Sequence, residues 1–345
     1  MSVNTSLAGL SDNTFQAAFL VYLVALVASL FYYVRLQAIV RLRRESHAAP
    51  APVAAGAGAS GTVAAERGGA EPSGAADRAG LADLAGREAK AAKWAGATQA
   101  LVWTGIILHV ISAVTRGLSA GRFPLGNLYE YVLVVSCITL AVAAAVVQRR
   151  GQQVVWPWIL TPLLVLMFIG ATKLYADSAP VVPALQSYWL PVHVTTVSTG
   201  ASIGIVSGVF SLLYLLRVWQ APGRESTQGA AGFFGAMATP LPSAERLDAI
   251  AYKLAVFTLP ILGMGIIFGA VWAEDAWTRF WGWDPKETFS FISWILYAAY
   301  LHARATAGWK VGAAWVNILA MGTMVFNLFF INLVVSGLHS YAGLN

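Results

Sequence analysis

Long apolar stretches alternate with short polar segments along almost the whole chain. A stretch of about 20 apolar residues is long enough to cross a bilayer as a helix. Eight such stretches are expected to form helices, at about residues 14–36, 95–115, 127–148, 154–174, 193–217, 249–271, 288–306 and 311–335. The pattern therefore predicts an all-α polytopic integral membrane protein with about eight transmembrane helices.

The first apolar stretch is interpreted as a retained helix and not as a signal peptide. It is too long for a signal peptide, no basic residue precedes it, and the basic run Arg41–Arg44 follows it. Most of the Lys and Arg residues then fall on the side of the membrane that this helix leads to, which the positive-inside rule assigns to the cytoplasm. The expected topology is N-out and C-out.

Two polar segments interrupt the helices. Residues 41–94 are rich in Ala and Gly with scattered charges, and they are expected to form a disordered cytoplasmic linker. Residues 221–247 resemble a second, shorter linker. The expected domains are a first helix over 1–40, this long linker, and a seven-helix core over 95–345 whose tryptophan-rich loop covers 270–288.

The composition excludes a soluble globular protein. Hydrophobic residues make up 58% of the chain and charged residues 11%, whereas about a quarter of an average soluble domain is charged. The net charge of +6 does not indicate nucleic-acid binding, because the basic residues lie between apolar stretches. Since the only cysteine is Cys137, inside an apolar stretch, any redox metal must be held by other ligands.

Four unusual segments are expected to gather on the outer side of the membrane. They are Gly121–Glu130, Leu185–Val194, Ala270–Trp294 and Ser336–Gly343. The third contains four tryptophans within twelve residues, namely Trp272, Trp277, Trp281 and Trp283. Tryptophans at this depth are typical of the aromatic belt that anchors helices at the headgroup level. Four in one loop also suit the binding of a large flat apolar ligand, because indole faces stack well. Both interpretations stay open.

Two histidines are expected at one outer level. His193 begins the fifth helix and His339 lies just beyond the eighth. A single interfacial histidine is usually solvated, but two beside a Trp-rich loop suit bis-imidazole ligation of a haem iron. His302 lies about 20 Å into the seventh helix, where an ionisable group is costly and suggests a function. A hydrogen bond between helices is the alternative for His302, and the preferred interpretation for His109.

Two further motifs have a structural and a functional interpretation. Asp284–Glu287 has the form of a capping box at the start of the seventh helix, and by fixing that start it also positions the Trp loop. Gly200, Gly204 and Gly208 repeat a GxxxG spacing on the fifth helix. This spacing permits close helix packing, and it would equally form a shallow groove for a porphyrin.

The run WGWDPKETFSFISW resembles the tryptophan-rich "WWD" signature of haem-handling membrane proteins. Within that group the chain is most similar to the CcsA/ResC family of System II cytochrome c biogenesis. Three further segments fit this family: Arg116–Glu130, Leu185–Val194 and the closing GLHSYAG. The resemblance covers about residues 95–345. The WWD run alone also fits System I proteins, whereas NLYE and GLHSYAG favour System II.

The resemblance implies haem delivery across the membrane and presentation to the CxxCH motif of apocytochrome c for thioether attachment. The chain would then be one half of a cytochrome c haem lyase in the bacterial plasma membrane, with the lipid bilayer around it and a ResB-type membrane partner. No nucleic acid is expected. A haem transporter without a ligation role and a haem-bearing electron-transfer subunit are the alternatives.

The resemblance also implies roles for particular residues. His193 and His339 would be the axial ligands of haem b at the outer face. The tryptophan loop would hold the porphyrin with Trp272, Trp277, Trp281, Trp283 and Asp284. His302 would be one ligand of an inner haem site, whose other ligand belongs to the ResB-type partner. No side chain is expected to act as a catalytic nucleophile.

Overall fold

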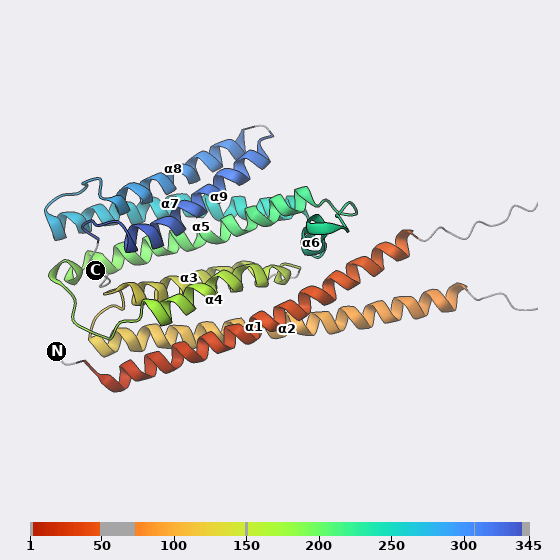
Figure 1. Cartoon of the computed structure of the whole chain (residues 1–345), viewed down its shortest axis with the longest axis horizontal. Helices are drawn as coiled ribbons and strands as arrows, with labels where there is room; N and C mark the ends of the chain where they lie inside the picture. Colours follow the sequence, from red (N-terminus) through yellow and green to blue (C-terminus); the bar gives the residue numbers. More distant parts are fainter. Residues whose placement is uncertain (1–2, 49–72, 149–150, 307, 340–345) are drawn as a thin grey trace, which may run out of the picture.

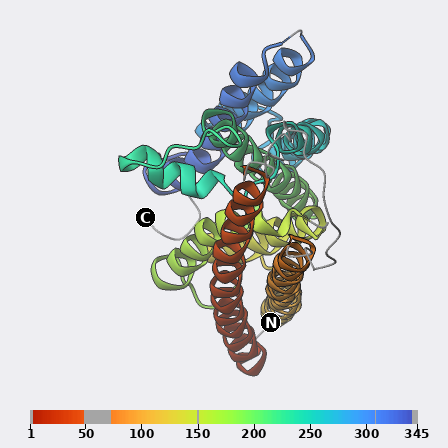
Figure 2. The ribbon, with the colours of Figure 1, turned by 90° about the vertical axis from the view of Figure 1, so that its right-hand side faces the viewer.

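The computed structural model of the chain describes residues 3–48, 73–148, 151–306 and 308–339. Its long helices run side by side along one axis (Figures 1 and 2). The α-helices are α1 Thr5–Ala48, α2 Ser73–Ala120, α3 Leu128–Val147, α4 Trp156–Lys173, α5 Trp189–Trp219, α6 Gly229–Ala238, α7 Ala244–Trp277, α8 Pro285–Ala305 and α9 Lys310–Phe326. A π-helical turn, Asn327–Ile331, continues α9, and short 3₁₀ turns form at Gln153–Val155 and Pro183–Gln186. These ranges contain no strand, so the all-α prediction is confirmed.

Seven helices within the described ranges are long and apolar enough to cross a membrane: α1 to α5, α7, and α9 with its π-helical turn. The prediction of a polytopic membrane protein is therefore confirmed. The expected span at 288–306 forms α8, which has 21 residues and packs beside α7 and α9 but is not among these seven. The start of α1 and the end of the π-helical turn lie at the same end of the bundle (Figure 1). The N-out and C-out orientation itself stays a prediction.

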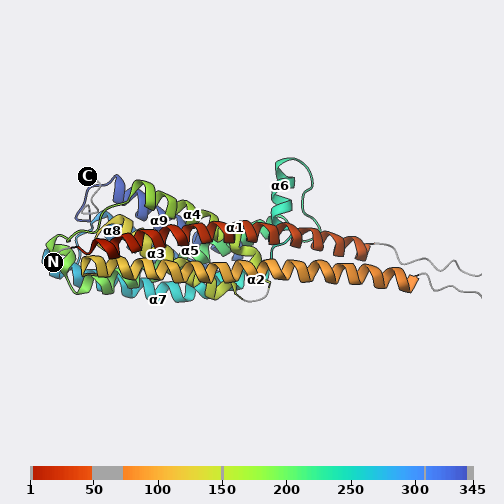
Figure 3. The ribbon, with the colours of Figure 1, turned by 90° about the horizontal axis from the view of Figure 1, so that it is seen from below.

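The helices α1 and α2 extend well past the rest of the bundle (Figure 3). Residues 41–48 belong to α1 and residues 73–94 to α2, so the prediction of a disordered linker over 41–94 is wrong at both ends. Alanine, the strongest helix former, is abundant there, and Asp83–Arg87 (i,i+4) and Arg43–Glu88 ion pairs stabilise the extension. Residues 49–72 of the expected linker lie outside the described residues. The second expected linker is also partly helical, since 229–238 form α6 and α7 begins at Ala244.

The glycines of α5 serve helix packing. A Cβ atom at Gly200 would lie 2.7 Å from the backbone nitrogen of Leu262 in α7, and one at Gly204 would lie 2.5 Å from the hydroxyl of Tyr297 in α8. At Gly208 it would lie 2.6 Å from the sulfur of Met321 in α9. Side chains and backbone of three helices thus fill the glycine face, which supports the packing interpretation and leaves no porphyrin groove there.

A buried ion-pair network ties the α2–α3 connection to the helix ends around it. Glu130 in α3 is fully buried and accepts hydrogen bonds from Arg116 at 3.1 Å and from Arg122 at 2.7 Å. Arg116 also donates to the carbonyl of Ala176, and Arg122 to that of Ala179 at 2.9 Å. The network therefore holds two of the outer segments, 121–130 and the approach to α5, in one arrangement.

Replacing Glu130 with Gln is expected to lower the free energy of unfolding by about 3–5 kcal/mol, because Arg116 and Arg122 would lose the buried carboxylate that they share, and Arg116 would keep only Asp12 at 3.9 Å. Thermal unfolding in detergent measures the effect. Glu88→Gln is the matched control, since it breaks the solvent-exposed Arg43–Glu88 pair and is expected to cost less than about 1 kcal/mol. Equal losses for both variants would contradict a stabilising role for the buried network.

Candidate functional site

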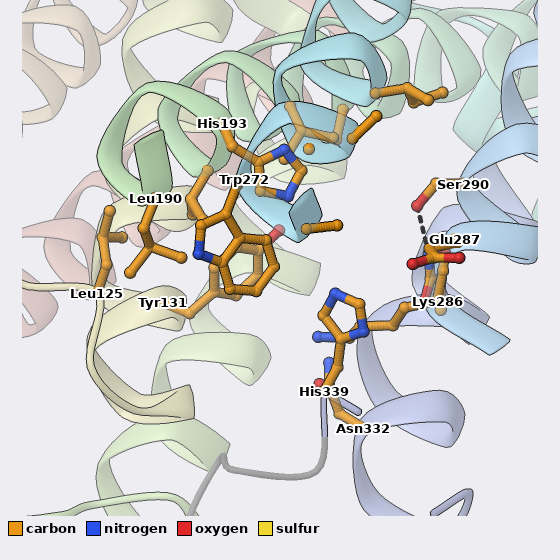
Figure 4. Close-up of a pocket in the computed structure, with 18 of the residues that line it drawn as sticks. Leu125, Tyr131, Leu190, His193, Trp272, Lys286, Glu287, Ser290, Asn332 and His339 are labelled. Carbon is orange, nitrogen blue, oxygen red and sulfur yellow. Dashed lines mark hydrogen bonds between the residues drawn. The ribbon is translucent and has the colours of Figure 1, made fainter. Parts of the chain in front are cut away.

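A cavity opens at the end of the bundle where the α7–α8 loop lies (Figure 4). Its walls come from α3, α5, α7, α8 and the segment that follows α9, and its volume is about 200 Å³. His193 and His339 both line it, as do three of the four tryptophans of 270–288, namely Trp272, Trp277 and Trp281. Trp272 and Trp277 belong to the last turns of α7, so the expected loop over 270–288 begins only after Trp277. The sequence thus identified residues that the fold brings together from positions far apart in the chain.

His193 lies in the first turn of α5, with one ring nitrogen already bonded. Its Nδ1 is 2.8 Å from the backbone carbonyl oxygen of Gly265 in α7. A carbonyl oxygen only accepts, so Nδ1 carries the proton and Nε2 keeps its lone pair. Gly269 makes room for the ring, since a Cβ there would lie 2.6 Å from the imidazole Cε1. His193 is therefore held as the tautomer that can bind a metal through Nε2.

His339 is held in the same way by a carboxylate. Its Nδ1 lies 2.8 Å from Oδ1 of Asp284. Burial lowers the pKa of His339, although the hydrogen bond to Asp284 opposes this shift, so the ring is neutral near pH 7. Burial raises the pKa of Asp284, but hydrogen bonds from His339 and from two backbone N–H groups outweigh it and hold that pKa at about 2. An ionised Asp284 accepts the Nδ1 proton, and Nε2 of His339 keeps its lone pair.

Asp284 combines both roles that the sequence left open. It is the N-cap of α8 in a complete capping box, accepting from the N–H of Lys286 at 3.1 Å while Glu287 accepts from the N–H of Asp284. It also accepts from the N–H of Leu338 at 2.8 Å. One carboxylate therefore fixes the start of α8 and the position of His339.

Trp272 and Trp277 join the two histidines into one aromatic cluster. The Trp272 ring stacks on His193 with centroids 5.7 Å apart and 10° between the planes, and it meets His339 edge-on at 5.6 Å. Trp277 lies 4.8 Å from Trp272 and 5.1 Å from His339. Trp272 is 1% exposed and donates its indole N–H to the carbonyl of Ala184, so a membrane-belt role does not account for it. Trp283 is 67% exposed, as the belt interpretation requires.

Trp283 has a strained backbone directly before the capping box. Its φ is 56°, in the left-handed region that costs a non-glycine residue roughly 1–2 kcal/mol. Its ring meets that of Trp281, which lines the cavity, edge-on at 5.6 Å. Strain of this kind persists where the side chain or its position is needed.

Replacing Trp283 with Gly is therefore expected to leave the stability unchanged or to raise it by up to about 1 kcal/mol, unlike most Trp→Gly changes, because the left-handed conformation no longer carries a penalty. Thermal unfolding in detergent measures this effect. Trp219→Gly, at an exposed helical position in α5, is the control and is expected to destabilise the protein. Equal destabilisation by the two changes would show that the strain at Trp283 has no energetic consequence.

His302 and His109 lie outside this cluster. His302 is exposed in the last turn of α8, 18 positions after Asp284, or about 27 Å along the helix. His109 is fully buried in α2, with its Nδ1 3.5 Å from the hydroxyl of Tyr22 and its ring edge-on to Phe15. Its Nε2 has no hydrogen-bond partner among the described residues. The structure therefore forms one paired-histidine site, with His302 at the opposite end of the bundle.

Several polar residues of the cavity were not singled out from the sequence, among them Lys286, Asn327 and Asn332. Lys286 lines it from the first turn of α8, and Asn327 and Asn332 line it from the end of α9. In the sequence, Lys286 belongs to the DPKE motif at the start of a helix, and this structural role gives no reason to expect a second one. The asparagines offered a usable signal, since polar side chains within an apolar membrane stretch are costly and often functional.

Fold and site together define the class: a multi-pass membrane protein with two neutral, oriented imidazoles in an aromatic-lined cavity at one end of the bundle. Comparison with known proteins agrees with this class. Residues 94–339 match the family model described as "Cytochrome C assembly protein". The chain is 34% identical over 246 residues to the cytochrome c biogenesis protein CcsA of Guillardia theta, covering 67% of this chain and 80% of that protein.

Two further relatives carry the same name. CcsA of Synechococcus sp. (strain CC9902) is 34% identical over 270 residues, covering 71% of this chain and 86% of the relative. CcsA of Chlamydomonas reinhardtii is 33% identical over 247 residues, covering 69% and 66%. The chain therefore belongs to the cytochrome C assembly protein family, as the sequence resemblance implied. Its role lies in cytochrome c biogenesis, a process that involves haem and apocytochrome c.

Proposed function

We propose that this chain carries haem b across the membrane and holds it at the outer end of the bundle, between His193 and His339. There it would be attached to apocytochrome c, by a haem lyase of which this chain is one half and a ResB-type protein the other. The bacterial plasma membrane is the proposed location. The proposal assigns iron ligation to the two histidines, and support of the porphyrin to the tryptophan loop and Asp284.

The observation that carries this proposal is the shared tautomer of the two histidines. Each gives its Nδ1 proton to a fixed acceptor, Gly265 in one case and Asp284 in the other. Haem iron takes neutral imidazole nitrogens, and a second acceptor behind the ring fixes its orientation. Two histidines prepared in this way in one cavity suit a low-spin bis-imidazole site better than a solvated membrane interface.

The cavity and its tryptophans suit a large flat ligand that is only partly enclosed. Its volume of about 200 Å³ is below the roughly 300–1,000 Å³ of most cofactor pockets, so a porphyrin would extend through the mouth. The exposed Phe280 and Trp283 lie in the loop at that mouth. In the proposal, Trp272 and Trp277 exclude water from the iron side, while the exposed aromatic residues cover the protruding edge.

When bound, haem supplies two vinyl groups, and each thiol of the CxxCH motif adds its S–H across one C=C bond to give a thioether. The protein positions the ring and lowers the dielectric around it. The histidine of the substrate motif would take the place of one of the two imidazoles on the iron. No nucleophile from this chain is needed.

His302 supports a second, earlier haem site in the proposal. Its side chain is exposed at the end of α8 that lies opposite the cavity. Because its imidazole is exposed, a ligand from another chain can reach it. The proposal assigns that ligand to the ResB-type partner.

A vesicle experiment tests the proposal against its two alternatives. The full chain is reconstituted with its ResB-type partner, haem is supplied on the cytoplasmic side, and apocytochrome c on the other. The expected result is haem that stays attached to the cytochrome on a denaturing gel, but not to a variant whose CxxCH is changed to AxxAH. Haem that crosses without ever becoming attached would establish the transporter, and quinol turnover with a stable haem potential would establish the electron-transfer subunit.

A further inference from the structure

Lys286 is a cation in the cavity without an ion-pair partner among the described residues. Its side chain lies beside His339, and both residues line the cavity (Figure 4). The two nearest carboxylates in the sequence are engaged elsewhere. Asp284 binds His339, and Glu287 accepts from the N–H groups of Gly282 and Asp284 and lies 3.9 Å from Arg279.

The position of Lys286 gives the helix no benefit. It is the second residue of α8, where the helix dipole and unpaired N–H groups favour anions and disfavour a cation. A charge among apolar walls is also costly unless an opposite charge accompanies it. Both costs disappear when a carboxylate of a ligand binds beside Lys286.

The side chains of two asparagines on the neighbouring wall are partly paired. The amide nitrogen of Asn327 donates to the carbonyl of Lys286 and to Ser290, and that of Asn332 donates to the carbonyl of Leu328 at 2.6 Å. The Oδ1 atoms of Asn327 and Asn332 are buried and make no hydrogen bond within the part of the chain that the structure describes. Both residues line the cavity, and the π-helical turn lies between α9 and Asn332. These donations fix the orientation of both amides, so their Oδ1 atoms offer the cavity acceptors and not donors. An ionised carboxylate only accepts, which leaves Lys286 as the cationic donor that lines the cavity.

We propose that Lys286 binds the propionate carboxylates of the haem and so sets the direction in which the ring enters the cavity. This inference rests on the proposed function, because it assigns a second contact to the same ligand. The propionates and the vinyl groups lie on opposite edges of protoporphyrin IX. With the propionates at Lys286, the vinyl edge points toward Leu125 and Leu190, which lie across the cavity from Lys286 (Figure 4).

The test compares two ligands that differ only in the carboxylates: iron protoporphyrin IX and its dimethyl ester. Dissociation constants are measured by titration of the Soret band on the full chain purified in detergent with its ResB-type partner. The wild type is expected to bind the diacid about 10- to 100-fold more tightly than the diester, the range of one charged hydrogen bond. Lys286→Met is expected to bring this ratio close to one, and Lys286→Arg to retain most of it.

Lys173→Met is the matched control. Lys173 is exposed in the last turn of α4, at the same end of the bundle but outside the cavity, so its loss changes the net charge equally and should leave the ratio unchanged. If Lys286→Met kept the wild-type preference for the diacid over the diester, or weakened the binding of both ligands equally, the assignment of Lys286 would be overturned. The haem site itself would remain supported. Failure of the wild type to bind either ligand with a bis-histidine spectrum would instead overturn the proposed function.

Discussion

Replacing both His193 and His339 with Ala is expected to abolish covalent haem attachment to cytochrome c. The cavity would lose both neutral Nε2 atoms that the structure prepares, and the tryptophans alone cannot hold the iron. The measurement is haem-stained cytochrome c in cells whose only copy of this protein is the variant. The amount of variant protein in the membrane is measured in parallel, so that loss of folding is separated from loss of ligation.

His109→Ala is the control for this prediction. It removes a buried histidine from α2, away from the cavity. The variant is expected to be less stable, but the haem attached per molecule of variant protein is expected to stay at the wild-type level. Normal maturation by the double variant, without added imidazole, would contradict the assignment of the two outer histidines as ligands.

Replacing Asp284 with Asn is expected to weaken haem binding by about 10- to 100-fold while changing stability little. Asn caps helices as well as Asp does, so the start of α8 is kept. The amide is neutral, however, and no longer holds His339 through a charged acceptor at 2.8 Å. Soret titration gives the affinity, and thermal unfolding in detergent gives the stability.

Ser243→Ala is the control for the Asp284→Asn variant. Ser243 caps α7, at the other end of that helix from the tryptophan loop, and its loss is expected to cost about 1 kcal/mol of stability with unchanged haem affinity. If Asp284→Asn lost stability but kept its haem affinity, Asp284 would be a helix cap alone, and its contact with His339 would have no role in binding.

Local features of the site were predictable from the sequence because they depend on neighbouring residues. The capping box needs only Asp284 and Glu287, three positions apart, and it forms as predicted. The clustering of the tryptophans follows from their spacing within twelve residues, although Trp272 and Trp277 lie in the last turns of α7 and not in a loop. His193 and His339 lie at one end of the bundle because the apolar stretches beside them begin or end there. Each of these properties is set within about one or two helical turns.

Contacts between distant segments were not predictable in the same way. The acceptor of His193 is the carbonyl of Gly265, 72 positions away, and a backbone group leaves no trace in the sequence. The helical extensions of α1 and α2 were missed because Ala-rich sequence with scattered charge fits a linker and an exposed helix equally well; here the two extensions pair with each other. Whether Gly200 serves close helix packing or a groove for a porphyrin depends on Leu262, which lies in another helix.

The absorption spectrum of the detergent-purified protein, co-expressed with its ResB-type partner, tests the central claim most directly. The wild type is expected to show a low-spin bis-histidine haem, whose signal weakens in the double variant of His193 and His339 and returns when imidazole is added. A wild-type complex without bound haem, or a double variant with an unchanged spectrum, would contradict an outer haem site held by these two histidines.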